Sequence, residues 1–215
     1  MNKGSHGAEI KLEPNSRPYL LKRVIADGFD AALVFMLFTV ISLMLFSSPV
    51  ANTYNEHYAN YIRVREEIAE EFANDTQAIA ESLNGNAYYL EERFAANLHS
   101  YLIKLLAGFL AESAVLLLIP LLSRFRKTPG KMMTNIMPFC ERKRAKASRL
   151  SVFGRFLFVF FIDSAFLYLY TGILTFLLVP VIRLTEMLLN KKNKTVCDAL
   201  SGVMIIEQLS YDGVC

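Results

Sequence analysis

The stretch Lys22-Arg23-Val24-Ile25-Ala26-Asp27-Gly28-Phe29-Asp30 opens the first long apolar run of this chain, and no charged residue follows it from Ala31 to Phe46. On an α-helix, Arg23, Asp27 and Asp30 stand at positions i, i+4 and i+7, so their side chains share one face. A carboxylate in hydrocarbon costs about 2.5 to 3.5 kcal/mol on insertion scales, so such residues face a protein interior or an aqueous cavity. The stripe therefore predicts either a buried packing element or a site.

The composition is typical of a membrane protein. Of the 215 residues, 53% are hydrophobic and 16 are Phe, and the mean hydropathy is +0.31. Ordinary soluble domains average about 45 to 50% apolar residues even with Gly counted. Four apolar stretches approach the twenty or so residues that cross about 30 Å of hydrocarbon. We predict an all-α membrane protein with four transmembrane helices at residues 23–46, 102–122, 152–169 and 171–189, with a turn near residues 168–172.

The distribution of charge predicts the orientation in the membrane. Residues 123–151 carry nine Lys or Arg and a single acidic residue, Glu141, which is the cytoplasmic pattern of the positive-inside rule. Residues 47–101 carry nine Asp or Glu and three Arg. The leader 1–22, the basic loop 123–151 and the tail 190–215 are therefore expected on the cytoplasmic side of a multi-pass protein of the cytoplasmic (inner) membrane. We expect no cleaved signal peptide, because the apolar region of such a peptide is short and uncharged, whereas this run would carry two Asp.

The acidic segment 47–101 has its own helical pattern. Apolar residues recur at helical spacing from Ile62 to Leu83, Asn84-Gly85-Asn86 interrupts the pattern, and it resumes to Leu98. We predict an extracytoplasmic helical hairpin whose second arm continues into the span 102–122. Two roles remain open: an amphipathic arm that packs on itself or on a second subunit, or a vestibule whose carboxylates attract cations.

The ionisable residues inside the predicted spans are the candidate functional residues. The carboxylates Asp27, Asp30, Glu112 and Asp163 are candidates for an ion or proton pathway, with Arg23, Arg155 and Arg183 as charge partners. Depth along the helices pairs Asp30 with Arg183 and Asp27 with Arg23 or Arg155. Glu112 and Asp163 lie near the midplane with no cation at their depth. Such carboxyl groups are either neutral and structural, or they bind a cation or relay protons.

The segments on the predicted cytoplasmic side complete a pattern that resembles the RDD family of small, mostly bacterial membrane proteins. The family is named for an Arg and two Asp, and it also has a T-x-G-K segment, a later Arg and Asp, and a terminal H-D-x-x-x-G element. The matching residues of this chain are Arg23, Asp27, Asp30, Thr128, Gly130, Lys131, Arg155, Asp163 and Asp198, with Cys197 in place of the His. The resemblance covers residues 17–207 apart from the acidic insertion. It implies the membrane fold, and associations with cation/proton exchange or with accessory roles in the envelope.

The segment Thr128-Pro129-Gly130-Lys131 is no phosphate-binding loop, because Met132 follows the Lys and no earlier Gly is in register. We expect Gly130 to make the turn where the chain leaves the second span, and Lys131 to lie among anionic lipid headgroups. The cations of residues 142–146 favour the same lipid partner over nucleic acid. Residues 132–139 and 203–207 are apolar and β-prone enough to pair as strands, with Pro138 at an edge.

No nucleophile with a base, zinc-ligand spacing or dinucleotide fingerprint is present in the sequence, and the thiols Cys140, Cys197 and Cys215 form no CxxC pair. We therefore expect neither an enzyme nor a metal or cofactor site. One hypothesis is a transporter or exchanger of Na⁺, K⁺ or H⁺ that uses Asp30, Glu112 and Asp163. The other is a non-transporting membrane scaffold, regulator or assembly factor of the envelope. Because four helices are few to enclose a pathway, we expect a homo-oligomer.

Overall fold

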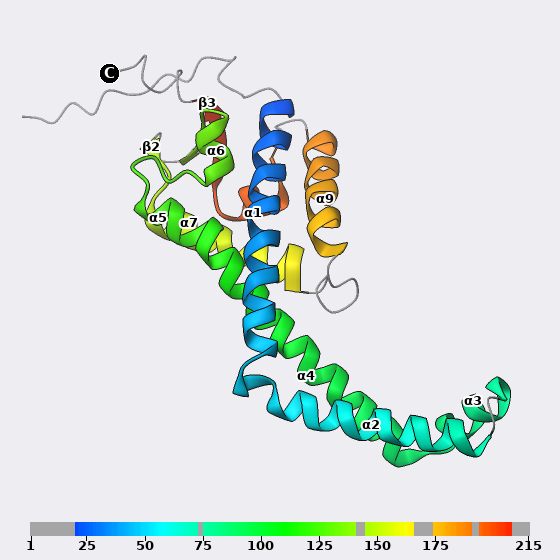
Figure 1. Ribbon diagram of the computed structural model, residues 1–215. Coiled ribbons are helices and arrows are strands. Elements are labelled where there is room, and N and C mark those ends of the chain that lie inside the picture. The colour runs from blue at the N-terminus through cyan, green and yellow to red at the C-terminus, as the bar shows by residue number, and fades with distance from the viewer. Residues whose placement is uncertain (1–19, 73–74, 141–144, 166–173, 191–193, 208–215) are drawn as a thin grey trace, which may run out of the picture. The chain divides into compact units, whose positions relative to one another are not determined.

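A computed structural model describes residues 20–72, 75–140, 145–165, 174–190 and 194–207, without the side chains of Asp163 and Thr175 (Figure 1). The described chain is mostly helical, as the composition predicts. It falls into two compact units: the described parts of Met1–Leu37 and Phe109–Cys215 form one, and Phe38–Gly108 forms the other.

Two helices are long and apolar enough to cross a membrane, by length and composition. The first is α1 (Leu20–Phe46). The second runs from Ala87 to Leu122 and consists of α4 (Ala87–Glu112), the π-helical segment η2 (Ser113–Leu118) and α5 (Ile119–Leu122). Pro120 has no N–H to donate to the carbonyl one turn earlier, which accounts for the altered helical bonding just before it. These helices contain the first and second predicted spans.

The region of the third and fourth predicted spans is also helical. The helix α7 (Arg149–Phe158) begins where Ser148 caps it by accepting a hydrogen bond from the backbone N–H of Ser151, and the π-helical segment η3 (Val159–Ser164) continues it. The helix α9 (Thr175–Leu189) contains Pro180. The predicted turn at residues 168–172 lies outside the described residues.

A small antiparallel sheet joins residues from both sides of the third and fourth predicted spans. The strands β1 (Ile136–Cys140), β2 (Ala145–Lys146) and β3 (Val203–Glu207) lie in the order β2-β1-β3, and Phe139 stands opposite both Lys146 and Met204. The predicted pairing of residues 203–207 with the end of 132–139 is confirmed. The start of that segment is instead the last part of the short helix α6 (Pro129–Met133). The described residues of the basic loop 123–151 therefore include one short helix and two strands of this sheet.

The expected edge position of Pro138 is wrong. Pro138 lies in the central strand β1, opposite Ile205 of β3. Its carbonyl accepts a hydrogen bond from the N–H of Ala147, on the side of β2. The N and O of one strand residue point toward the same neighbour, so the missing N–H also falls on that side, where β2 has already ended at Lys146. The proline therefore removes no hydrogen bond to β3.

Both faces of the sheet are buried. On one face Val203 and Ile205 pack with Ala26 of α1 and Val152 of α7, and on the other Ile206 packs with Met137 and Phe139 of β1. This alternation follows from the two-residue period of a strand. The helix α10 (Val196–Leu200) precedes β3, and Gly202 at φ 66° makes the turn between them, a conformation that favours glycine. The sheet thereby holds α10 against the start of α1.

The second unit consists largely of the predicted acidic hairpin. It contains the short 3₁₀ turn Pro49–Ala51, α2 (Asn52–Glu71), α3 (Thr76–Gly85) and most of α4. The helix α3 ends at the predicted break. A further break that the spacing did not predict separates α2 from α3, where Asp75 caps α3 by accepting hydrogen bonds from the N–H groups of Gln77 and Ala78. Val64, Ile68 and Tyr89 form the buried core of this unit.

Candidate functional site

The charged stripe of α1 faces the interior of its unit. Arg23, Asp27 and Asp30 are 4%, 7% and 3% exposed, whereas Ile25 and Met36 on the same helix are 50% and 55% exposed. A helix of a soluble protein buries its apolar face and exposes its charges. The inverse arrangement in α1 places the polar cluster inside and leaves an apolar exterior.

Asp30 is held by the segment that carries the T-x-G-K pattern. The hydroxyl of Thr128 donates a hydrogen bond to Oδ2 of Asp30, and the backbone N–H of Gly130 donates one to Oδ1 over 2.7 Å. The sequence analysis expected Gly130 to make the turn where the chain leaves the second span. In the structure, Gly130 lies instead in the first turn of α6, against α1. A Cβ on Gly130 would lie 2.0 Å from the carbonyl oxygen of Ala26, so this approach requires glycine.

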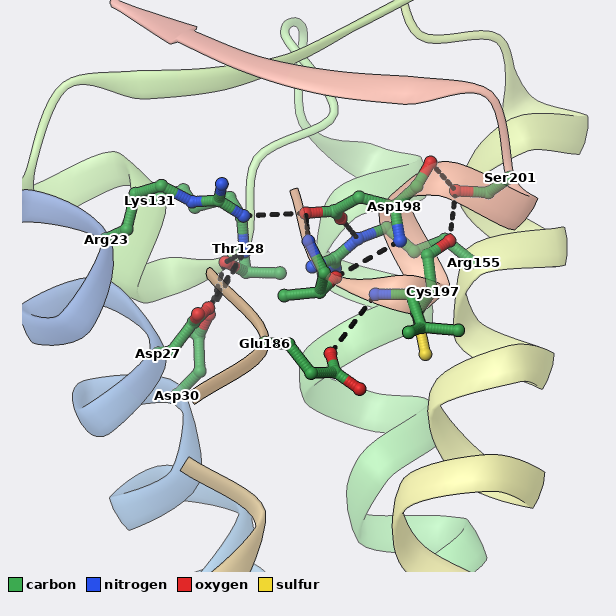
Figure 2. A network of polar contacts seen from close by, with 12 residues as sticks. Arg23, Asp27, Asp30, Thr128, Lys131, Arg155, Glu186, Cys197, Asp198 and Ser201 are labelled. Atoms are coloured by element: carbon green, nitrogen blue, oxygen red, sulfur yellow. Dashed lines mark hydrogen bonds and ion pairs between the residues drawn. The ribbon is translucent and has the colours of Figure 1, made fainter. Parts of the chain in front are cut away.

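Lys131 lies inside the cluster and not among lipid headgroups as the sequence analysis expected. Its side chain is 4% exposed, and Nζ is 3.7 Å from Oδ1 of Asp27 and from Oδ2 of Asp30 (Figure 2). Nζ also donates a hydrogen bond of 3.2 Å to Oγ1 of Thr128. Burial and the nearby charge of Arg155 lower the pKa of Lys131, although the charges of Asp27 and Asp30 oppose this shift. Lys131 is thus a cation beside both carboxylates of the stripe.

Asp198 of α10 receives two of the predicted charge partners. Nη2 of Arg23 donates to Oδ2 of Asp198 over 2.6 Å, and Nε of Arg155 donates to Oδ1 over 2.7 Å. Asp198 also completes a capping box with Thr195 at the start of α10. Burial of Asp198 would raise its pKa, but the charges of Arg155 and Arg23 outweigh that effect and hold the pKa well below its usual range. Asp198 is therefore an ionised, fully paired carboxylate that links α1, α7 and α10.

Cys197 stands where the family pattern has His, and its side chain is buried beside Asp198 in α10. The hydroxyl of Ser201 donates to the carbonyl oxygen of Cys197, and Oε2 of Glu186 on α9 accepts from the N–H of Val196 (Figure 2). These contacts anchor both ends of α10. They use backbone atoms, so they do not depend on the identity of residue 197.

A small pocket adjoins the cluster. Its polar lining consists of Asp27, Asp30, Glu112, Ser164 and Arg183, and the rest of its wall is apolar. Glu112 is 4% exposed, and it directly precedes η2. Ser164 is the last residue of η3. Both π-helical segments therefore border the pocket, and such segments occur frequently at functional sites. Asp163 lies in η3, but its side chain is outside the described ones.

The described cluster contains four basic and four acidic side chains. Its cations are Arg23, Lys131, Arg155 and Arg183, and its carboxylates are Asp27, Asp30, Glu112 and Asp198, so four of each stand together. Sequence reasoning proposed all eight as charge partners, pathway residues or family-motif positions, with Lys131 among the family-motif positions. The role of Lys131 as a partner was missed, because no helical spacing relates it to α1.

Comparisons with protein-family models, with curated proteins and with solved structures found no match to this chain.

Proposed function

We propose that this chain is an integral membrane protein of the RDD family that exchanges a monovalent cation for a proton. The observation that carries the proposal is the pocket in which Asp27, Asp30 and Glu112 lie together with Arg183 between the helices of an apolar-faced unit. Carboxylates inside a membrane-embedded bundle mark ion or proton pathways when they line a cavity.

The membrane part of the proposal rests on the outer surfaces of the helices. Exposed apolar side chains lie on α1, on η3 and along α9, for example Phe29, Phe161 and Leu177. We propose four spans, formed by α1, by the second half of α4 with η2 and α5, by α7 with η3, and by α9. With the basic residues of 123–151 on the cytoplasmic side, both chain ends lie inside and the acidic hairpin 47–101 outside.

Family membership is supported by the way the motif residues meet. Eight positions that carry the resemblance belong to four separate segments of the sequence and form one buried cluster: Arg23, Asp27, Asp30, Thr128, Gly130, Lys131, Arg155 and Asp198. Residues that are far apart in the chain and touch in the fold act as a unit. Their contacts within one cluster give a physical reason for these residues to occur together as one motif.

The balance of charge provides a mechanism for exchange. With all eight groups ionised the cluster is neutral, so a cation that enters the pocket adds an uncompensated charge in a region that excludes most water. Release of one proton from the ammonium group of Lys131 restores neutrality. The lowered pKa of Lys131 supports this ammonium group as a proton donor. Binding of the cation and loss of a proton are coupled by this electrostatic requirement.

The second candidate function is a scaffold that does not transport. It is favoured by the hydrogen bonds of Asp30 and Asp198. Each of these carboxylates accepts hydrogen bonds from two partners, as is typical of a carboxylate that stabilises a fold. In this case the acidic hairpin and the basic cytoplasmic surface bind envelope components and anionic lipid. In the transport case, a homo-oligomer encloses the rest of the pathway.

Flux measurements separate the two functions. Proteoliposomes with the purified chain and an internal pH indicator should show proton movement when Na⁺ or K⁺ is added outside. Glu112→Gln and Asp163→Asn keep side-chain shape but remove a carboxylate, so each should abolish flux while thermal stability in detergent is retained. Glu207→Gln, which lies in β3 and outside the pocket, is the matched control and should keep full flux. Absence of cation-dependent flux in the parent protein would support the scaffold.

A further inference from the structure

A second pocket lies beside the charge cluster, and three of its lining side chains are basic. Arg126, Lys131 and Arg155 supply these cations, and the rest of the wall is Thr128 and apolar residues of η2, α5, β1, α7 and β3. The pocket holds about 310 Å³ of empty space, counted with its open mouth. Among the described residues no acidic side chain lines it, in contrast to the pocket that contains Asp27 and Asp30.

Separate segments bring the three cations together. Lys131 lies in α6, Arg155 lies in α7, which packs against α5, and Arg126 lies in the turn between α5 and α6. The hydroxyl of Ser123 fixes this turn by accepting a hydrogen bond of 2.7 Å from the N–H of Lys127. Arg126 has φ 57°, which is uncommon for a residue with a side chain. The turn is therefore a built feature of the pocket wall.

Arg126 differs from the other two cations in its partners. Lys131 and Arg155 each pair with carboxylates of the cluster, whereas Arg126 pairs with no carboxylate among the described residues. Its Nη1 donates hydrogen bonds to the carbonyl oxygens of Leu121 and Ser123. Within the described chain no hydrogen bond uses its Nε or Nη2. These two N–H groups form one edge of the guanidinium fork, whose geometry matches two oxygens of a phosphate.

The charge beside the pocket is positive. With its groups ionised, the cluster of four cations and four carboxylates is neutral, and Arg126 adds one positive charge next to it. The cations of the pocket are also close enough to repel one another, since the charge of Arg155 lowers the pKa of Lys131. An anion in the pocket would neutralise the added charge and reduce this repulsion.

We propose that the pocket lined by Arg126, Lys131 and Arg155 binds a phosphate group. Arginine binds phosphate through two parallel hydrogen bonds, and lysine binds it as a point charge. Two sources supply such a group, the headgroup of an anionic phospholipid and soluble phosphate. Basic pockets between transmembrane helices on the cytoplasmic side bind lipid headgroups, and the proposed topology places this pocket on that side. The site does not depend on whether the chain transports cations.

The test uses the full chain in detergent with two probes, inorganic phosphate alone and phosphatidic acid added to the micelles. Sodium chloride at equal ionic strength and phosphatidylcholine are the matched additions without a specific effect. A probe that binds the folded protein should raise its unfolding temperature. A shift with phosphatidic acid alone assigns the site to a lipid headgroup. A shift with both probes assigns it to any accessible phosphate group.

Variants locate the binding. Arg126→Gln removes one cation from the pocket, so titration of the active probe should show binding weakened about fivefold or more. Arg126→Lys keeps the charge and loses the fork, so it should weaken binding less than Arg126→Gln. Arg124→Gln is the matched control, because Arg124 is exposed in the same segment and does not line the pocket. Equal weakening by Arg124→Gln and Arg126→Gln would show attraction to the basic surface in general and would overturn the proposal.

A measurement on the parent protein does not depend on the folding of any variant. Phenylglyoxal modifies arginine side chains, and mass spectrometry locates the modified residues. The bound probe should protect Arg126 and leave Arg124 reactive. Absence of a thermal shift with both probes, or unchanged modification of Arg126 at a saturating probe concentration, overturns the proposal.

Discussion

The carbonyl oxygen of Ala26 lies 2.0 Å from the point that a Cβ on Gly130 would occupy. This close approach of α6 to the backbone of α1 brings the N–H of Gly130 within 2.7 Å of Oδ1 of Asp30. The residue type at position 130 therefore decides whether the cluster can assemble.

Replacement of Gly130 by Ala should destabilise the fold by about 1 to 3 kcal/mol or more, because α6 must move away from α1 and the hydrogen bond to Asp30 lengthens. Thermal unfolding in detergent measures the effect. Gly28→Ala is the matched control: Gly28 lies on the exposed side of α1, and an added Cβ meets nothing within 4 Å. That control should be neutral or stabilising by up to about 1 kcal/mol. Equal effects of the two substitutions would contradict the close packing.

Replacement of Asp198 by Asn should be among the most damaging changes in the chain. It leaves the guanidinium groups of Arg23 and Arg155 without their carboxylate, and removal of one partner from a buried ion pair costs about 3 to 5 kcal/mol. Glu207→Gln breaks the partly exposed pair with Lys22 and should cost at most about 1 kcal/mol. The comparison of unfolding midpoints tests this difference. An Asp198→Asn protein as stable as Glu207→Gln would show that the cluster contributes little to folding.

The contribution of Asp198 to the free energy of unfolding should decrease when the pH is lowered. Its pKa is lower in the folded protein than in the unfolded chain, where an Asp titrates near 3.9. The stabilisation is therefore complete above about pH 5 and is lost as the pH falls through about 4 toward the folded-state pKa. The difference in midpoint between the parent and Asp198→Asn should be constant from about pH 7 to 5 and should shrink at about pH 3.5. A difference that grows with acidification would exclude an ionised Asp198.

The proposed topology predicts a labelling pattern. In a background in which the native cysteines are replaced, a cysteine at Glu71 of α2 should react in intact cells with a thiol reagent that does not cross membranes. A cysteine at Lys146 of β2 should react only after the cells are permeabilised. Both positions are exposed in the fold, so burial does not account for the contrast. The reversed pattern would rule out the four-span orientation.

Local chemistry was sufficient to predict much of this fold. The uncharged run after Asp30 and the apolar stretch 102–122 predict two long helices. A helix makes its backbone hydrogen bonds within its own segment, so the local sequence is enough to predict it. The interruption at Asn84-Gly85-Asn86 and the strand 203–207 follow from residue preferences over a few positions. The membership of Arg23, Asp27 and Asp30 in one buried stripe follows from the helical period alone.

Contacts between distant segments were decided only by the tertiary structure. The sequence placed Lys131 at the lipid surface and Gly130 in a turn, because their partners, Asp30 and Ala26, lie about a hundred residues earlier in the chain. The position of Pro138 in a central strand depends on where β2 ends, and the meeting of Arg126 with Arg155 at one pocket depends on how α7 packs against α5. Spacing along a helix or strand reports which residues share a face. The residue that this face meets is set by the packing of whole elements, which no local pattern contains.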